Sequence, residues 1–220
     1  MENSANDKYV HALGYSWLTP CYDAVVGLTT REKIFKHALI RQARLAPEHI
    51  ILDLACGTGT LTIWAKQSEN SGRFTGVDGD EKILQLAREK TRRANLDIRY
   101  DHALSTHLPY DDAVYDRVIS SLFFHHLDWQ SKIASAQEMY RVLKPGGEIH
   151  IADWGRPANR MMRLLFYLIQ LLDGFENTQP NVDGKLIEVF EQAGFSSVTC
   201  EEHFNTIFGT MSLYRAEKRT

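Results

Sequence analysis

The 220-residue chain has few cysteines, and the three that it has, Cys21, Cys56 and Cys200, lie far apart. An odd number at such spacing provides neither the close pairs of a zinc site nor a disulfide framework, so no metal site is expected and a reducing cytoplasm is the simplest setting. Long apolar runs are also missing: none reaches the roughly 20 residues that span a bilayer, and the polar residues 1–8 lack the core of a signal peptide. We therefore expect a cytoplasmic protein with no integral membrane segment.

A strong excess of one charge is absent as well. The chain carries 25 Lys and Arg against 28 Asp and Glu, which gives a formal net charge of -3. Without the basic field that binding to phosphate backbones requires, nucleic acid is not an expected partner. The share of hydrophobic residues, 44%, is that of an ordinary globular protein, and the length fits one domain.

Apolar runs of strand length alternate with helical patterns, which is typical of a mostly parallel sheet covered by helices. Strands are expected at 50–54, 72–77, 98–100, 115–120 and 148–152, and helices at 81–94, 129–142 and 186–193. Two more strands, at 197–205 and 210–216, would form an antiparallel hairpin. The predicted fold class is α/β, a Rossmann-like mixed seven-stranded sheet with helices on both faces and the last strand antiparallel.

A Gly-rich turn follows the first expected strand and leads into a helix that starts near Thr60. Gly57 and Gly59 lack a Cβ, so the backbone can bend sharply and approach a ligand, whose carboxylate can sit at the helix N-terminus. Asp78 follows about 20 residues after Gly57, where an acidic group that ends the second strand can bind both hydroxyls of a ribose. Together these features predict a nucleoside cofactor.

Three readings of that cofactor compete. A dinucleotide fingerprint would need a third Gly where Thr62 stands, and a phosphate-binding P-loop would need a Gly-Lys-Ser/Thr sequence that this turn lacks. At this point the chain resembles the class I S-adenosylmethionine-dependent methyltransferases, and in detail the branch of ubiquinone/menaquinone C-methyltransferases. The likeness covers about residues 22–153 and is carried by Leu52-Asp53-Leu54-Ala55-Cys56-Gly57-Thr58-Gly59, Gly76-Val77-Asp78, Leu108-Pro109-Tyr110, Tyr115-Asp116-Arg117-Val118 and Arg141-Val142-Leu143-Lys144-Pro145-Gly146-Gly147.

The resemblance implies S-adenosyl-L-methionine as the cofactor. It implies that the Gly-rich turn and Asp53 hold the methionine end, that Asp78 holds the ribose, that His102 and Ala103 lie beside the adenine, and that Tyr22 contacts the cofactor carboxylate. Ser120 begins the segment after the fourth strand that is expected to touch cofactor or acceptor. The complete set of expected cofactor-binding residues is Tyr22, Asp53, Gly57, Thr58, Gly59, Asp78, His102, Ala103 and Ser120.

Two adjacent histidines, His125 and His126, are the candidate catalytic residues. Histidine has a pKa range suited to proton abstraction near neutral pH, provided that the side chain reaches the acceptor. A structural or hydrogen-bonding role for both is the alternative, and Asp153 and Trp154 after the fifth strand are alternative lining residues. Cys56 is expected to pack as a small hydrophobe under the turn.

Four segments of the single domain follow from this interpretation: an N-terminal helical cap at 1–45, a cofactor-binding core at 46–155, a lid or substrate insertion at 156–185, and a C-terminal helix with the hairpin at 186–220. The cap is expected to fold as helices over the strand ends. The insertion holds an apolar helix at 161–172, in which Arg163, Tyr167 and Gln170 form a narrow polar stripe. This helix is either a lid over an apolar small molecule or packs on the core or on the second subunit of a homodimer.

The expected reaction is methyl transfer to a small-molecule acceptor, hydrophobic or aromatic, by direct in-line displacement. The sulfonium carries a good leaving group, so the protein chiefly supplies alignment and desolvation. The alternative function is a nucleoside-cofactor-binding protein of the same fold without methyl transfer activity. A measurement of cofactor turnover would distinguish it from a methyltransferase.

Overall fold

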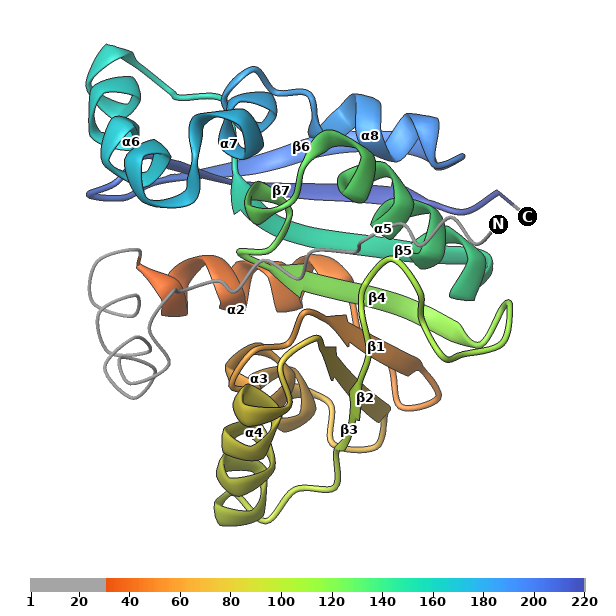
Figure 1. Ribbon diagram of the computed structural model, residues 1–220. Helices are drawn as coiled ribbons and strands as arrows, with labels where there is room; N and C mark the ends of the chain where they lie inside the picture. Colours follow the sequence, from red (N-terminus) through yellow and green to blue (C-terminus); the bar gives the residue numbers. More distant parts are fainter. Residues whose placement is uncertain (1–30, 220) are drawn as a thin grey trace, which may run out of the picture.

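The computed structural model describes residues 31–219 (Figure 1). Strands and helices alternate along the chain as far as β3, and β4 follows β3 with no helix between them. The strands are β1 (Ile50–Leu54), β2 (Arg73–Asp78), β3 (Arg99–His102), β4 (Tyr115–Ser121), β5 (Leu143–Trp154), β6 (Ser196–Asn205) and β7 (Thr210–Glu217). The helices are α2 (Glu32–Ala43), α3 (Thr60–Ser68), α4 (Glu81–Arg93), the 3-10 helix η2 (Phe124–His126), α5 (Trp129–Val142), α6 (Arg160–Asp173), α7 (Phe175–Val182) and α8 (Leu186–Gln192).

All seven strands form one sheet in the order β3-β2-β1-β4-β5-β7-β6. β1 lies between β2 and β4 and is parallel to both, whereas β7 is antiparallel to β5 and to β6. The predicted Rossmann-like mixed sheet is therefore confirmed. Its strand order reverses between β1 and β4, and ligands of such sheets bind beside this reversal, outside the carboxyl ends of the strands.

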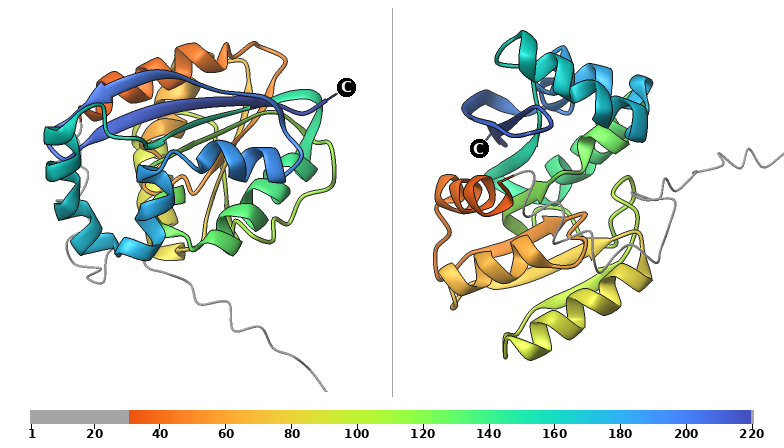
Figure 2. Two further views of the ribbon diagram at one scale, coloured as in Figure 1. Left: turned by 90° about the horizontal axis from the view of Figure 1, so that it is seen from above. Right: turned by 90° about the vertical axis from the view of Figure 1, so that its left-hand side faces the viewer.

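Helical layers cover both faces of the sheet (Figure 2). Because side chains alternate along a strand, Leu52 of β1 packs in the core under α5 and α8, while Ile51 packs in the core under α2 and α3. α4 extends the second layer over β2 and β3, where Leu84 and Ala87 pack with Tyr100.

Side-chain caps start three of the helices. Asp80 accepts hydrogen bonds from the first-turn N–H groups of α4, Asp128 accepts one from the Ser131 N–H in α5, and Asn159 accepts one from the Met162 N–H in α6. Such caps satisfy N–H groups that the helix itself leaves without a partner. They explain why α4 and α5 begin at the positions expected from the sequence.

The fifth strand begins earlier than expected. It includes the Lys-Pro-Gly-Gly segment, where the pairing with β4 shifts between Tyr115, opposite Leu143, and Arg117, opposite Glu148. Backbone hydrogen bonds to Lys218 hold Gly146 and Gly147 against the end of β7. The Lys-Pro-Gly-Gly segment is thus an irregular part of the strand, where the pairing with β4 is interrupted.

Within the cap expected at 1–45, the residues before the first strand form α2, which ends at Ala43. Phe35, Leu39 and Ala43 are buried in the core with Ile51, so this helix covers a face of the sheet, and the expectation that it lies over the strand ends is wrong for the described part. The rest of the expected cap, with Tyr22, lies outside the described residues. No helix among residues 31–219 is long and apolar enough to cross a membrane.

Candidate active site

The Gly-rich turn after β1 contains two glycines with different local demands. Gly57 has φ +55°, and a Cβ added there would meet no atom of residues 31–219 within 4 Å. Gly59 has φ +76°, and an added Cβ would lie 2.6 Å from the Tyr100 hydroxyl oxygen. Gly59 is therefore required by packing against β3, whereas the space over Gly57 is open to a ligand.

Asp78, the last residue of β2, accepts a backbone hydrogen bond at each of its two carboxylate oxygens. Its Oδ2 accepts a hydrogen bond from the Gly57 N–H at 2.9 Å, and its Oδ1 accepts one from the Asp80 N–H at 3.0 Å. Burial raises the pKa of Asp78, and these two hydrogen bonds act in the opposite direction. Each oxygen keeps a second lone pair, so the carboxylate is held ready to accept further hydrogen bonds.

Asp53 in β1 is almost fully buried, with 1% of its surface exposed. Its Oδ2 accepts a hydrogen bond of 2.5 Å from the Thr62 hydroxyl, so the residue that stands in place of a third glycine anchors this carboxylate. Its Oδ1 has no hydrogen-bond partner among the described residues. Burial raises the pKa of Asp53 to about 7. A buried carboxylate oxygen without a donor is costly, and a cationic donor would satisfy it.

The other expected cofactor residues lie around the same strand ends. The Thr58 hydroxyl accepts a hydrogen bond from Lys90 at 3.0 Å, and the buried Ser120 hydroxyl donates to the Leu54 carbonyl at 2.7 Å, which ties β4 to β1 under the turn. At the end of β3, a ring nitrogen of His102 lies 3.0 Å from the Gly79 carbonyl, and the N–H of the next residue, Ala103, donates to the Asp78 carbonyl. These contacts join the loops after β1, β2 and β3 into one rim.

Cys56 takes no part in this rim. Its side chain is buried in a cluster with Leu84, Ala87 and Tyr100, and burial raises the pKa of its thiol well above the ordinary value. A thiol held protonated is a poor nucleophile. The expectation that Cys56 packs as a small hydrophobe is confirmed.

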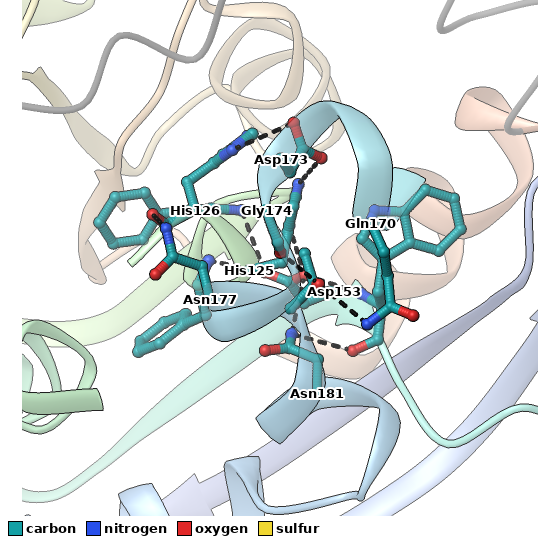
Figure 3. A network of polar contacts seen from close by, with 12 residues as sticks. His125, His126, Asp153, Gln170, Asp173, Gly174, Asn177 and Asn181 are labelled. Carbon is teal, nitrogen blue, oxygen red and sulfur yellow. Dashed lines mark hydrogen bonds and ion pairs between the residues drawn. The ribbon is translucent and has the colours of Figure 1, made fainter. Parts of the chain in front are cut away.

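A second polar group surrounds His125 on η2, beyond the end of β4 (Figure 3). His125 is buried, and its Nδ1 lies 2.7 Å from Asp153 Oδ1. The Asp153 carboxylate also accepts hydrogen bonds from the N–H groups of Phe123, Phe124 and Trp154. Asp153 is fully buried in β5, so it positions the histidine and does not line the crevice.

One side chain of α6 and one of α7 complete the polar group around His125. Asp173, the last residue of α6, lies 3.6 Å from His125 Nε2 and 3.8 Å from His126 Nδ1. Burial, followed by the charge of His125, lowers the pKa of His126 well below its ordinary value. The Asn177 amide in α7 donates to the His126 carbonyl at 3.0 Å. No pattern in the sequence points to Asp173 or Asn177, because both lie about 50 residues beyond the histidines and α7 contains Pro180.

The apolar helix α6 buries one stripe and exposes another. Met162, Phe166 and Gln170 face the core, and Phe166 contacts Trp154 with ring centroids 5.3 Å apart. Gln170 donates to Thr178 and Gln179 of α7, and it accepts a hydrogen bond of 2.7 Å from Arg163, which belongs to the same expected polar stripe. The exposed apolar side chains on and beside α6 are Met161, Leu164, Tyr167, Leu168, Leu171, Leu172 and Phe175.

Comparison with known proteins identifies the family. Residues 51–147 match a family described as a methyltransferase domain. A demethylmenaquinone methyltransferase of Lactobacillus johnsonii is 34% identical over 174 residues, which cover 74% of this chain and 68% of the relative. The chain belongs to the class I S-adenosylmethionine-dependent methyltransferases. S-adenosylmethionine is accordingly the cofactor of this methyltransferase.

Solved structures share the fold of this methyltransferase. A putative methyltransferase of Bacillus halodurans superposes with a TM-score of 0.68 at 20% identity, covering 84% of this chain and 99% of the other. The [4+2]-cyclase SpnF superposes with a TM-score of 0.67 at 16% identity, covering 84% and 81%. Such low identities show the fold alone, and the names of the two proteins indicate that this fold serves more than one chemistry.

The rim around Gly57 fits S-adenosylmethionine. The cofactor carries an ammonium group and a ribose diol, and the methyltransferase offers a buried carboxylate oxygen without a donor on Asp53 and spare lone pairs on Asp78. The space above Gly57 admits a ligand next to the backbone. In a P-loop or dinucleotide site the turn would face phosphate, which two neighbouring carboxylates would repel.

Proposed function

We propose that this enzyme transfers a methyl group from S-adenosylmethionine to a small hydrophobic aromatic acceptor of the quinol type, by direct in-line displacement. The observation that carries the proposal is the relative at 34% identity, whose name specifies demethylmenaquinone methylation. The apolar side chains of α6 beside the His125 group support an acceptor with a large apolar surface.

The cofactor side of the proposed site consists of the expected residues. The bound cofactor supplies an electrophilic methyl group on a sulfonium, whose sulfur leaves with the bonding electrons. Asp53 accepts hydrogen bonds from the ammonium, Asp78 accepts them from the ribose hydroxyls, and His102 and Ala103 flank the adenine. Thr58, Gly59 and Ser120 keep the rim in shape through the contacts described above. The protein's contribution is alignment of the two reactants.

The acceptor side is proposed at His125 and His126, with the end of α6 above them. An aromatic ring becomes nucleophilic when a hydroxyl on it loses its proton, so the site must stabilise the deprotonated acceptor. Asp153 orients His125 for this task through the Nδ1 hydrogen bond. The exposed apolar stripe of α6, with Leu168, Leu171 and Leu172, is proposed to contact the hydrophobic part of the acceptor or the second subunit of a homodimer.

We keep the proposed roles of 46–155 as cofactor-binding core, of 156–185 as acceptor insertion and of 186–220 as C-terminal helix with the hairpin. The segment at 1–45 stays a proposed N-terminal helical segment, whose helix α2 covers a face of the sheet. We place the reaction in the cytoplasm, because Cys56 and Cys200 are free thiols and thiols persist in a reducing compartment.

A labelled-methyl assay tests the proposal. Purified enzyme and methyl-labelled S-adenosylmethionine are incubated with a reduced demethylated naphthoquinone, a simple catechol and a phospholipid headgroup amine, with Asp78→Ala as the control for cofactor binding. The proposal predicts label in the naphthoquinol product and none with Asp78→Ala. Label in the headgroup amine alone would overturn the acceptor class.

One observation favours a second function. The chain shares its fold with a [4+2]-cyclase, so a cofactor-bound protein that transforms its ligand without methyl transfer is the alternative. It predicts tight cofactor binding with no formation of S-adenosylhomocysteine in the presence of any of the three acceptors.

A further inference from the structure

Three metal-ligating side chains meet at the junction of η2 and α6. His125, His126 and Asp173 each offer one ligand atom, and these atoms all lie within 4.8 Å of one another. Figure 3 shows the two imidazoles and the carboxylate converging from different elements. Among residues 31–219 this is the one group of three His, Cys, Asp or Glu side chains with such spacing.

The separations within the group are too long for hydrogen bonds. Asp173 lies 3.6 Å from His125 Nε2 and 3.8 Å from His126 Nδ1, whereas an N–H···O hydrogen bond extends to about 3.2 Å. Ligand atoms of a tetrahedral ion with bonds of about 2.1 Å lie about 3.4 Å from each other. The two contacts involve different oxygens of Asp173, and single ligand atoms of the three residues lie within 4.8 Å of one another. Side-chain movements of about 1 Å would therefore bring them to coordination distance.

The hydrogen bond between His125 and Asp153 aims the His125 Nε2 atom into the group. Asp153 Oδ1, 2.7 Å from His125 Nδ1, belongs to a carboxylate that already accepts three backbone N–H groups. Because a carboxylate can only accept, Nδ1 donates to Asp153, and Nε2 is the ring nitrogen that faces Asp173. A carboxylate behind a histidine is also the usual outer support of a metal-bound imidazole.

Side chains of α5 and α7 form hydrogen bonds with the backbone around the two histidines. The buried Lys132 of α5 donates to the carbonyls of Leu127 and Asn177, and Asn177 donates to the His126 carbonyl. The Asn181 amide reaches Asp153 Oδ1 and the Trp154 carbonyl. These contacts hold η2 and α7 together, so the two histidines are preorganised on supported backbone.

We propose that His125, His126 and Asp173 bind one divalent transition-metal ion. Two imidazole nitrogens and one carboxylate oxygen suit zinc, iron(II) or cobalt(II) better than magnesium or calcium, and three protein ligands leave a coordination position open. At this position, and resting on the proposed function, the ion binds an acceptor oxygen whose proton passes to solvent, and it stabilises the resulting negative charge. The sequence-based expectation of no metal site is replaced by this proposal.

Direct titration tests the site without any acceptor. Untagged enzyme is stripped with chelator and titrated with Co²⁺, whose visible absorption reports coordination, and the Co²⁺ is then displaced with Zn²⁺. The proposal predicts one Co²⁺ per chain, and affinity lowered on the order of 100-fold in His126→Ala and in Asp173→Asn. His107→Ala, which removes an exposed histidine outside the group, should bind as the unaltered chain does.

Two results would overturn the metal site: less than a third of an equivalent of Co²⁺ bound, or equal affinity in the unaltered chain and in both ligand variants. S-adenosylhomocysteine binding, measured by calorimetry on the same samples, separates this proposal from the function. Metal binding without nucleoside binding would contradict the cofactor site alone, and nucleoside binding without metal would contradict the metal site alone. Thermal unfolding of each variant confirms that it is folded.

Discussion

Asp53→Asn should stabilise the ligand-free enzyme and weaken its cofactor binding. The structure buries the carboxylate with one oxygen bonded to Thr62 and the other without a partner. An asparagine oxygen can still accept the Thr62 hydrogen bond, but it carries no charge to desolvate. The substitution therefore removes a cost of folding and also removes the charge that is proposed to hold the cofactor's ammonium.

The pH dependence of this effect follows from the pKa of Asp53. Burial raises it from 3.8 to about 7, so the group's contribution to stability is full below the unfolded value and is lost as pH rises through the folded value. The loss is about 1.4 kcal/mol per pH unit between about pH 4 and pH 7, and about 4 kcal/mol in total. The variant lacks this loss, so its advantage over the unaltered chain should grow over that window and stay constant above pH 7.

Thermal unfolding from pH 5 to pH 8, with bound cofactor removed, measures the effect. The advantage of Asp53→Asn should rise by about 5–10 °C across this range, since 1 kcal/mol shifts the Tm of a domain of this size by about 2–4 °C. Asp116→Asn is the control of opposite sign. Burial raises the pKa of Asp116, but hydrogen bonds from Lys144 and the Ile50 N–H outweigh burial and lower the pKa. That variant should be less stable than the unaltered chain by the same amount from pH 5 to pH 8, because the contribution of a carboxylate with a lowered pKa changes only below the unfolded value of 3.8. A pH-independent advantage of Asp53→Asn, or a less stable variant at pH 8, would refute the reasoning.

Three further predictions concern the turn, α6 and the sheet. Gly57→Ala should fold, at a cost of about 1 kcal/mol for its positive φ, and should bind S-adenosylhomocysteine at least 10-fold more weakly by calorimetry; unchanged affinity would remove the ligand from this turn. Leu168→Ser with Leu172→Ser, on the exposed stripe, should raise the acceptor KM while changing the free energy of unfolding by less than about 0.5 kcal/mol and leaving cofactor affinity unchanged. Glu148→Gln should lower the free energy of unfolding by about 2–3 kcal/mol at pH 7 and by progressively less from pH 4.5 to pH 2, as measured by urea unfolding. Burial raises the pKa of Glu148, but hydrogen bonds from His150 and Arg215 outweigh it and lower the pKa to about 2. An equal loss of stability at pH 7 and at pH 2 would contradict this.

Much of the fold could be predicted because local signals and packing agree. β1 and α5 have the bounds expected from the sequence, since each combines a clear apolar pattern with a turn or a capping residue at its start. The hairpin of β6 and β7 was also expected. α7 was not, because Pro180 and several polar residues hide a short helix whose stability comes from contacts with η2 and β5.

The cofactor rim was visible in the sequence because its residues lie within two adjacent strand ends. Gly57 and Asp78 are 21 residues apart, and their contact of 2.9 Å follows from the pairing of β1 with β2. The role of Thr62 as the hydrogen-bond donor to Asp53 was not visible, since that contact depends on the side-chain direction one helical turn into α3. Asp173 was missed for a related reason: only the packing of α6 beside η2 brings it to the histidines.

The most direct test of the account is calorimetric titration of the unaltered chain and of Asp78→Ala with S-adenosylmethionine, S-adenosylhomocysteine and NAD. The account predicts that the two methionine-derived ligands bind the unaltered chain at one per chain, that NAD does not bind, and that the folded variant loses about 2 kcal/mol of binding, or roughly 30-fold in affinity. NAD binding, or equal affinity of the folded variant and the unaltered chain for S-adenosylmethionine, would contradict it.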